Sequence, residues 1–61
     1  MARYNAWAKG QMIASGDNVN QVMQEARVAA RENLKPMYRG EEFPISIKDT
    51  TSGVEVMSQY I

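Results

Sequence analysis

The stretch DNVNQVMQEARVAARENLKP, residues 17–36, decides the fold, because it is the longest segment with a single clear periodicity. Asp17 or Asn18 can accept hydrogen bonds from the unpaired N–H groups of a first helical turn. Pro36 disfavours helical geometry in the residue before it, so the helix should end near residue 34 or 35. Apolar residues at three- and four-residue spacing form one stripe of this helix: Val19, Val22, Met23, Ala26, Ala29, Ala30 and Leu34.

The segment before this helix alternates with the period of two that is typical of half-buried strands. Residues 4–15 are interpreted as two short strands joined by a tight turn at Lys9 and Gly10, with one bent strand as the alternative. In this alternation Ala6 and Ala8 face the helix and Trp7 faces away from it. A slip of one residue would exchange the two faces and place Trp7 in the core.

The segment after the helix predicts a hairpin. Residues 43–48 and 54–61 both alternate, and the turn between them contains Gly53, which supplies a positive φ. Pro44 cannot donate a ladder hydrogen bond, so its strand either lies at a sheet edge or begins pairing after Pro44.

The order strand or hairpin, helix, hairpin predicts an α+β fold in a single domain, residues 1–61. One amphipathic helix would pack on a three- to four-stranded antiparallel sheet. Small residues in the first strand fit a close crossing by the helix. The predicted core face of the sheet contains Tyr4, Ala6, Ala8, Phe43, Ile45, Ile47, Val54 and Val56.

With 61 residues, the chain is small for a domain that is stable alone. A domain of this size buries only about 60% of the surface that its unfolded chain exposes. Disulfides, a structural metal or oligomerisation usually supply the missing stability. The chain has no Cys and no His, which excludes disulfides and the common zinc sites, so we expect a homo-oligomer or docking on a larger partner.

The composition also argues against catalysis. Without His or Cys there is neither an imidazole base nor a thiol nucleophile, and the sequence has no phosphate-binding glycine loop or nucleophile-elbow motif. A chain this short can hardly enclose a pocket of ordinary ligand size. We therefore expect no enzyme activity, no catalytic residues, no cofactor and no bound metal.

Seven basic and seven acidic residues give a net charge of zero. This balance removes bulk attraction to nucleic acid or an anionic membrane, and it leaves little repulsion between copies. No apolar run is long enough for a signal peptide or a membrane span, so we expect a cytoplasmic protein without membrane partners.

The outer face of the predicted sheet is the first candidate binding surface. The alternation of the last strand puts Met57 and Ile61 on the same face as Trp7. Trp is enriched at energetically dominant interface positions, and Met adapts to irregular partners. These three residues are predicted to bind a second copy or a protein target. A lone Trp lying on its own sheet is the alternative.

One edge of the helix, with Arg27, Arg31 and Lys35, is the second candidate surface. Arginine suits bidentate contacts with carboxylates or phosphates, so this edge would fit an acidic protein surface, a nucleotide or a nucleic acid. Alternatively these cations are only solvated, and the helix dipole favours those near the C-terminus. Because the net charge is zero, a protein partner is favoured over nucleic acid.

Two resemblances bear on function. The stretch SGDNVNQVMQEARVAA, residues 15–30, resembles the strand-to-helix junction of HicB-like antitoxins, with Gly16, Asp17 and Asn18 in place of a Gly-Asp-Thr-type cap. The short, cysteine-free layout of one helix and a sheet resembles small phage-encoded, anti-defence inhibitors of host enzymes or immune complexes. That layout implies a non-enzymatic homodimer that binds and blocks a protein target in the host cytoplasm. A nucleotide or nucleic-acid module formed between subunits, an antitoxin or a structural subunit are the alternatives.

Overall fold

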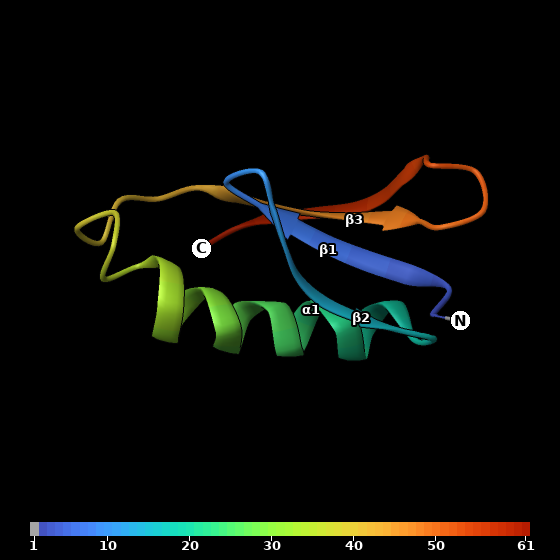
Figure 1. The fold of residues 1–61 in the computed structure, drawn as a ribbon, viewed down its shortest axis with the longest axis horizontal. Coiled ribbons are helices and arrows are strands. Elements are labelled where there is room, and N and C mark those ends of the chain that lie inside the picture. Colours follow the sequence, from blue (N-terminus) through green and yellow to red (C-terminus); the bar gives the residue numbers. More distant parts are fainter. Residues whose placement is uncertain (1) are drawn as a thin grey trace.

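The computed structural model describes residues 2–61. Four strands form one antiparallel sheet in the order β2-β1-β3-β4, and the helix lies along one face of it (Figure 1). This arrangement confirms the predicted α+β fold and shows that the sheet has four strands. The elements are β1 (Tyr4–Ala8), β2 (Gln11–Gly16), α1 (Val19–Ala29), η1 (Ala30–Leu34), β3 (Pro44–Asp49) and β4 (Glu55–Tyr60).

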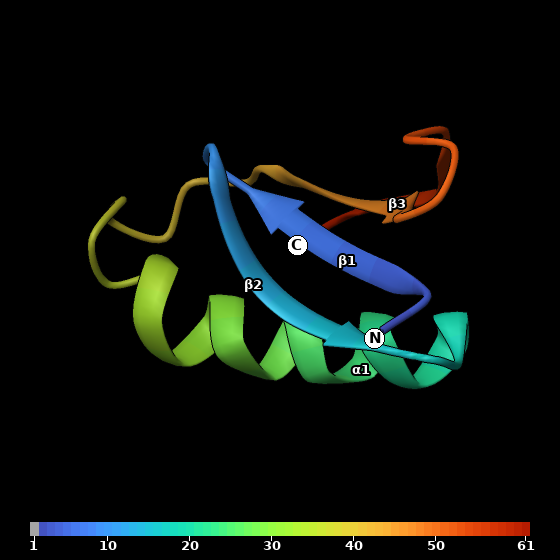
Figure 2. The ribbon, with the colours of Figure 1, turned by 45° about the vertical axis from the view of Figure 1, so that its right-hand side comes forward.

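The N-terminal hairpin is tight because Lys9 and Gly10 both take positive φ, at 52° and 75°. Two such residues form the hairpin turn whose twist matches that of the flanking strands. The pairing of β1 with β2 shifts between Ala6 and Trp7, and β2 curves down onto α1 (Figure 2). The approach is close: a Cβ on Gly16 would lie 3.0 Å from Cγ2 of Val22.

The helix begins at the predicted cap. Oδ1 of Asn18 accepts hydrogen bonds from the backbone N–H groups of Asn20 and Gln21, at 3.0 and 3.2 Å. Asp17, the other candidate, instead accepts a hydrogen bond from the backbone N–H of Arg3 at 3.1 Å. Asn18 therefore caps α1, whereas Asp17 ties the start of α1 to the start of β1.

The helix ends at Leu34, as predicted, but its last turn is wider than an α-helical turn. In η1 the backbone follows π geometry, and the N–H of Lys35 bonds to the carbonyl of Ala30 at 2.8 Å. Lys35 keeps helical angles although Pro36 follows it, which differs from the expectation. Because a proline ring meets the carbonyl four residues back in a regular α-helix, the wider turn suits a chain that continues through Pro36.

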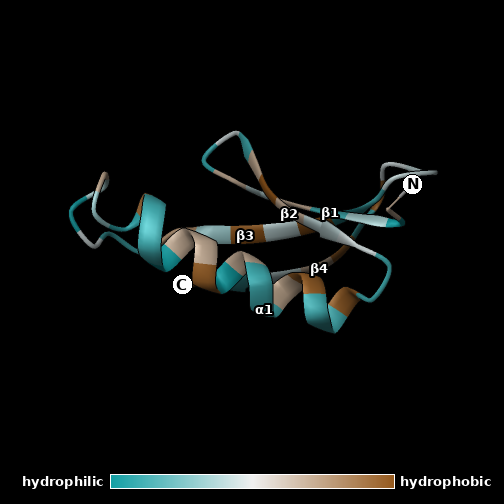
Figure 3. Ribbon diagram, turned by 60° about the horizontal axis from the view of Figure 1, so that its bottom comes forward, coloured by the Kyte–Doolittle hydropathy of each residue, from teal (hydrophilic) through white to brown (hydrophobic). Residues whose placement is uncertain are grey.

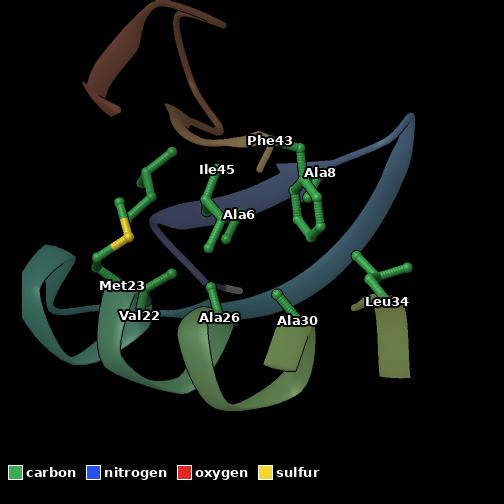
Figure 4. Packing of buried hydrophobic residues seen from close by; sticks show 10 residues of the cluster. Ala6, Ala8, Val22, Met23, Ala26, Ala30, Leu34, Phe43 and Ile45 are labelled. Carbon is green, nitrogen blue, oxygen red and sulfur yellow. The ribbon is translucent and has the colours of Figure 1, made fainter. Parts of the chain in front are cut away.

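The core lies between α1 with η1 and the inner face of the sheet. Figure 4 shows the side chains of the helix and of the sheet pointing toward one another, and hydrophobic bands recur along α1 in Figure 3. Burial of Ala6 and Ala8 confirms the predicted register of β1, with Trp7 on the opposite face. The buried residues are Ala6, Ala8, Val22, Met23, Ala26, Ala30, Leu34, Phe43, Ile45 and Ile47.

The predicted core position of Val54 and Val56 is wrong. They are 59% and 47% exposed, while Met57 packs against the core. The register between β3 and β4 determines which side chains of β4 face the helix, since Ile47 stands opposite Met57 on the helix side of the sheet. A bulge between this pair and the next then breaks the alternation around Val56.

β1 is paired on both sides, with β2 and with β3. The chain of β1 is also held at its start, because the N–H of Thr50 bonds to the carbonyl of Arg3 at 2.9 Å and its Oγ1 donates to the carbonyl of Ala2 at 2.8 Å. The prediction that the strand of Pro44 lies at a sheet edge or begins pairing after Pro44 is wrong, since β3 is a central strand and Pro44 stands opposite Tyr60 of β4. On the side of β1, where Pro44 has no N–H to donate, pairing starts only at Ser46.

Replacing a core alanine of the helix tests how closely it packs on the sheet. Ala26 has no exposed surface, so Ala26→Leu should force helix and sheet apart and lower the free energy of unfolding by about 1–3 kcal/mol. Thermal unfolding should show a fall of roughly 4–8 °C per kcal/mol. Val28→Leu on the exposed side of α1 is the control and should stay within about 0.5 kcal/mol. Equal melting temperatures of the two variants would contradict this packing.

Candidate protein-interaction face

The side of the sheet opposite α1 is left bare by the described residues, 2–61 (Figure 1). We call it the open face. Its members follow from the strand register, because residues directly opposite each other in an antiparallel pair share a face. The open face contains Asn5, Trp7, Met12, Ser15, Pro44, Ser46, Lys48, Glu55, Ser58 and Tyr60.

The middle of the open face is a row across all four strands. Trp7 stands opposite Met12 on one side and Ser46 on the other, and Ser46 in turn stands opposite Ser58. This row carries no charge. Trp7 is 36% exposed, so its large ring is partly covered by neighbours yet still reaches the surface at the centre of the sheet.

The two ends of the open face differ in character. At one end Pro44 stands opposite Tyr60, whose side chain is 65% exposed. At the other end Lys48 stands opposite Glu55, so opposite charges adjoin there. The open face thus has a neutral centre with an exposed aromatic ring. One of its ends is apolar, and the other carries one positive and one negative charge, which cancel.

The prediction that Met57 and Ile61 share the face of Trp7 is wrong. Both are partly buried and pack against the core on the helix side of the sheet. Ile61 exchanges two backbone hydrogen bonds with Phe43, at 3.0 and 3.2 Å, which places it beside a core residue. In their place, the structure brings Met12 and Tyr60 to the open face, and the sequence analysis had not assigned Tyr60 to any surface.

The predicted basic edge is largely occupied by contacts within the chain. A guanidinium N–H of Arg27 donates to Oε1 of Gln59 on β4 at 3.2 Å. The ammonium of Lys35 donates to the carbonyl of Glu41 at 2.9 Å and lies 5.3 Å from the ring centre of Phe43. Arg31 is exposed, and within residues 2–61 its side chain makes no hydrogen bond or ion pair.

Sequence reasoning missed a cluster in which the first hairpin turn meets the loop after the helix. The ammonium of Lys9 lies 4.7 Å from the ring centre of Tyr38, and the rings of Tyr38 and Phe43 meet edge to face at 6.3 Å. Lys35 approaches Phe43 from the helix. Cation–π contacts of Lys9 therefore link the loop to the hairpin, and the hydrogen bonds of Lys35 tie the loop to the end of the helix.

The described residues contain no surface pocket and no group of three or more His, Cys, Asp or Glu side chains placed to hold a metal ion. Within residues 2–61, neither helical segment has the length and apolar character needed to cross a bilayer.

Replacing Lys35 distinguishes a structural cation from a free one. Lys35→Met keeps the aliphatic length but removes the charge-assisted hydrogen bond to the carbonyl of Glu41 and the contact with Phe43. Because Lys35 is half-exposed, we expect a loss of about 1 kcal/mol in the free energy of unfolding, measured by urea denaturation. Arg31→Met is the control, with a change within about 0.5 kcal/mol. If Lys35→Met leaves the free energy of unfolding unchanged, Lys35 is a free surface cation and not a structural one.

Two surfaces thus have the chemistry of a binding site: the open face around Trp7 and the exposed part of the helix around Arg31. The open face is the broader of the two, since it crosses all four strands. No known protein family, curated protein or solved structure matches this chain, so no partner is assigned to either surface by similarity.

Proposed function

We propose that this protein is a non-enzymatic interaction module that forms a homodimer and blocks a protein target through its open face. The observation that supports this proposal is the position of Trp7, the only Trp of the chain, at the centre of a sheet face that α1 leaves uncovered. Trp is the residue type most enriched where binding energy concentrates. Met12, beside it in the register, is 54% exposed and can adapt its shape to a partner.

The character of the open face favours a protein over a nucleic acid. Its middle row is uncharged, and the cation of Lys48 is matched by Glu55 across the strand pair. A surface that binds phosphates needs an excess of cations, because counterion release supplies most of that affinity. On the helix, Arg27 and Lys35 already have partners within the chain, which leaves Arg31 alone.

The proposed mode of action is occupation of a surface. A sheet face with an exposed aromatic ring at its centre and polar residues beside it has features of a protein-binding patch, in which apolar and polar residues lie close together. Binding of this kind inhibits by covering a target's own working surface and needs no chemistry from the inhibitor. Blockage is proposed as the outcome because this layout resembles that of small, cysteine-poor phage-encoded anti-defence inhibitors, which act by occupying a surface.

The test compares two arginine substitutions at exposed apolar positions on opposite sides of the molecule. Trp7→Arg alters the open face, whereas Val28→Arg alters the outer side of α1. Circular dichroism should show that both variants fold. Tagged wild type and variants are then used for affinity capture from bacterial lysate with quantitative mass spectrometry, and the captured protein is purified for calorimetry.

The expected result is that Trp7→Arg weakens binding of the captured protein about 30-fold or more, while Val28→Arg binds as wild type does. This corresponds to a loss of about 2 kcal/mol, the usual size for a dominant interface residue. Equal capture by both variants would overturn the assignment of the open face. A second experiment measures the melting temperature with nucleotides and short oligonucleotides at low salt. A rise in the melting temperature that disappears in Arg31→Ala would favour a ligand-binding module instead.

A further inference from the structure

β4 is the exposed edge of the sheet. It is the last strand in the order β2-β1-β3-β4, and within residues 2–61 nothing pairs with its outer side. The opposite edge is different, because β2 curves onto α1 and is covered there (Figure 2). The β3–β4 turn in the same view projects away from α1, so β4 receives little cover from the helix.

The hydrogen-bonding groups of β4 that point outward can be identified. Ile61 and Phe43 exchange both of their backbone hydrogen bonds, so Ile61 points its groups toward β3. Such pairs alternate along an antiparallel ladder, so Gln59 also points toward β3. Ser58 and Tyr60 therefore direct their N–H and C=O groups away from the sheet, ready to pair with another strand.

The side chains of β4 do not protect this edge. Natural edge strands are commonly blunted by Lys, by Pro or by strong irregularity. β4 has neither Lys nor Pro, and its one charge, Glu55, and its bulge both lie at its beginning. From Met57 to Tyr60 the strand is regular, uncharged and mostly exposed, which is the kind of edge that accepts another strand.

We propose that the occupant of this edge is β4 of a second copy of the same chain, paired antiparallel about a two-fold axis. This inference rests on the homodimer of the proposed function and names the surface that forms it. Zero net charge leaves no overall repulsion between copies. An isologous pairing also joins the two unprotected β4 edges to each other, so that only the β2 edges, each beside its own α1, remain at the outside of the dimer.

Geometry selects the register of this pairing. A two-fold axis normal to the sheet keeps both helices on one side, so residues paired across the axis must belong to the same face. Pairing Ser58 with its own copy meets this condition and joins the outward groups of Ser58 and Tyr60 over the regular part of the strand. It places Tyr60 opposite Val56 of the other copy, and two such pairs cover two exposed apolar side chains in each chain.

The same register separates the acidic residues. Glu55 lies beyond the bulge, at the far end of the paired strands from its copy, so the two carboxylates do not meet. The product is a continuous eight-stranded sheet with both helices on one side and both open faces on the other. The two Trp7 side chains then lie on one surface, available to a target with two equivalent sites or one broad site.

Single-cysteine variants test this pairing cleanly, because the natural chain has no cysteine. In the proposed register the two Cα atoms at position 58 lie about 5.5 Å apart, within the range that a disulfide spans. Ser46→Cys is the matched control, since Ser46 neighbours Ser58 on the same face but one strand inward. The expected separation of its two copies is about 15 Å, from a strand spacing of about 4.8 Å, and no disulfide spans that distance.

The measurement combines sedimentation of the reduced wild type, from micromolar to millimolar concentration, with cross-linking rates in a glutathione redox buffer. We expect a dimer, and Ser58→Cys should cross-link at least tenfold faster than Ser46→Cys. Ser58→Pro removes an outward N–H that β3 does not use, so it should remain folded by circular dichroism and dissociate at least tenfold more readily.

If the wild type is monomeric at all concentrations, both this pairing and the proposed homodimer are wrong. Target binding through Trp7 is tested separately, by the capture experiment with Trp7→Arg. A dimer in which Ser46→Cys cross-links as fast as Ser58→Cys would overturn the edge pairing alone and point to contact between open faces. Fastest cross-linking by Gln59→Cys would contradict the register, because that result requires a shift of the two strands by two residues.

Discussion

The width of a single helix is the constraint on which the rest of this structure depends. A helix with its side chains is about 10 Å across, whereas four strands spaced by about 4.8 Å form a wider layer. The chain partly resolves the mismatch by curving β2 down onto α1, which brings the helix beneath β2, β1 and β3. β4 is left beyond the helix, and the second face of the sheet is left bare. The open face and the unprotected edge thus have one physical origin, a shortage of covering elements in a short chain.

The same shortage limits the core. The large buried side chains are Val22, Met23, Leu34, Phe43, Ile45 and Ile47, and the remaining core residues are alanines that let helix and sheet approach closely. Close approach gains packing contacts but little buried area per residue, since the hydrophobic contribution scales with the apolar surface removed from water. A domain with so few large buried side chains gains more than most from a second copy that covers further apolar surface.

The sequence predicted the parts of the fold that local chemistry determines. The three- and four-residue spacing located the helix, and one of the two candidate caps, Asn18, begins it. Gly10 and Gly53 located the two turns, and each has a positive φ. β1 was placed correctly because its two faces differ so much in size, with small alanines against Trp7. β4 gave no such contrast, since Val54 and Val56 compete with Met57 and Ile61, and alternation alone does not say which apolar set turns inward. That choice is made by pairing with β3 and by a bulge, both of which depend on residues distant in sequence.

The candidate site was predicted in part for the same reason. The position of Trp7 on the open face could be predicted, because it depends only on the alternation of its own strand. The neighbours of Trp7 come from three other strands, and their positions depend on the register of pairing. Lys35 resembled a free surface cation in the sequence. Its partners lie in a loop that folds back over the helix end, and no helical spacing signals such a contact. The fate of a charged side chain at the end of a helix is therefore decided by the loop that follows it.

The pairing of β1 on both sides also determines when the chain can fold during its synthesis. Residue 4 pairs with residue 49, and three of the six large core side chains belong to the segment that starts at Phe43. The first hairpin and the helix leave the ribosome with almost nothing to pack against. At a synthesis rate of 5–20 residues per second, the interval between residues 4 and 49 is about 2–9 s. Until β3 has been made, β1 lacks its second partner strand and the apolar stripe of the helix lacks part of its sheet, so a chaperone or a finished copy of the same protein can reach the first half of the chain before its second half does.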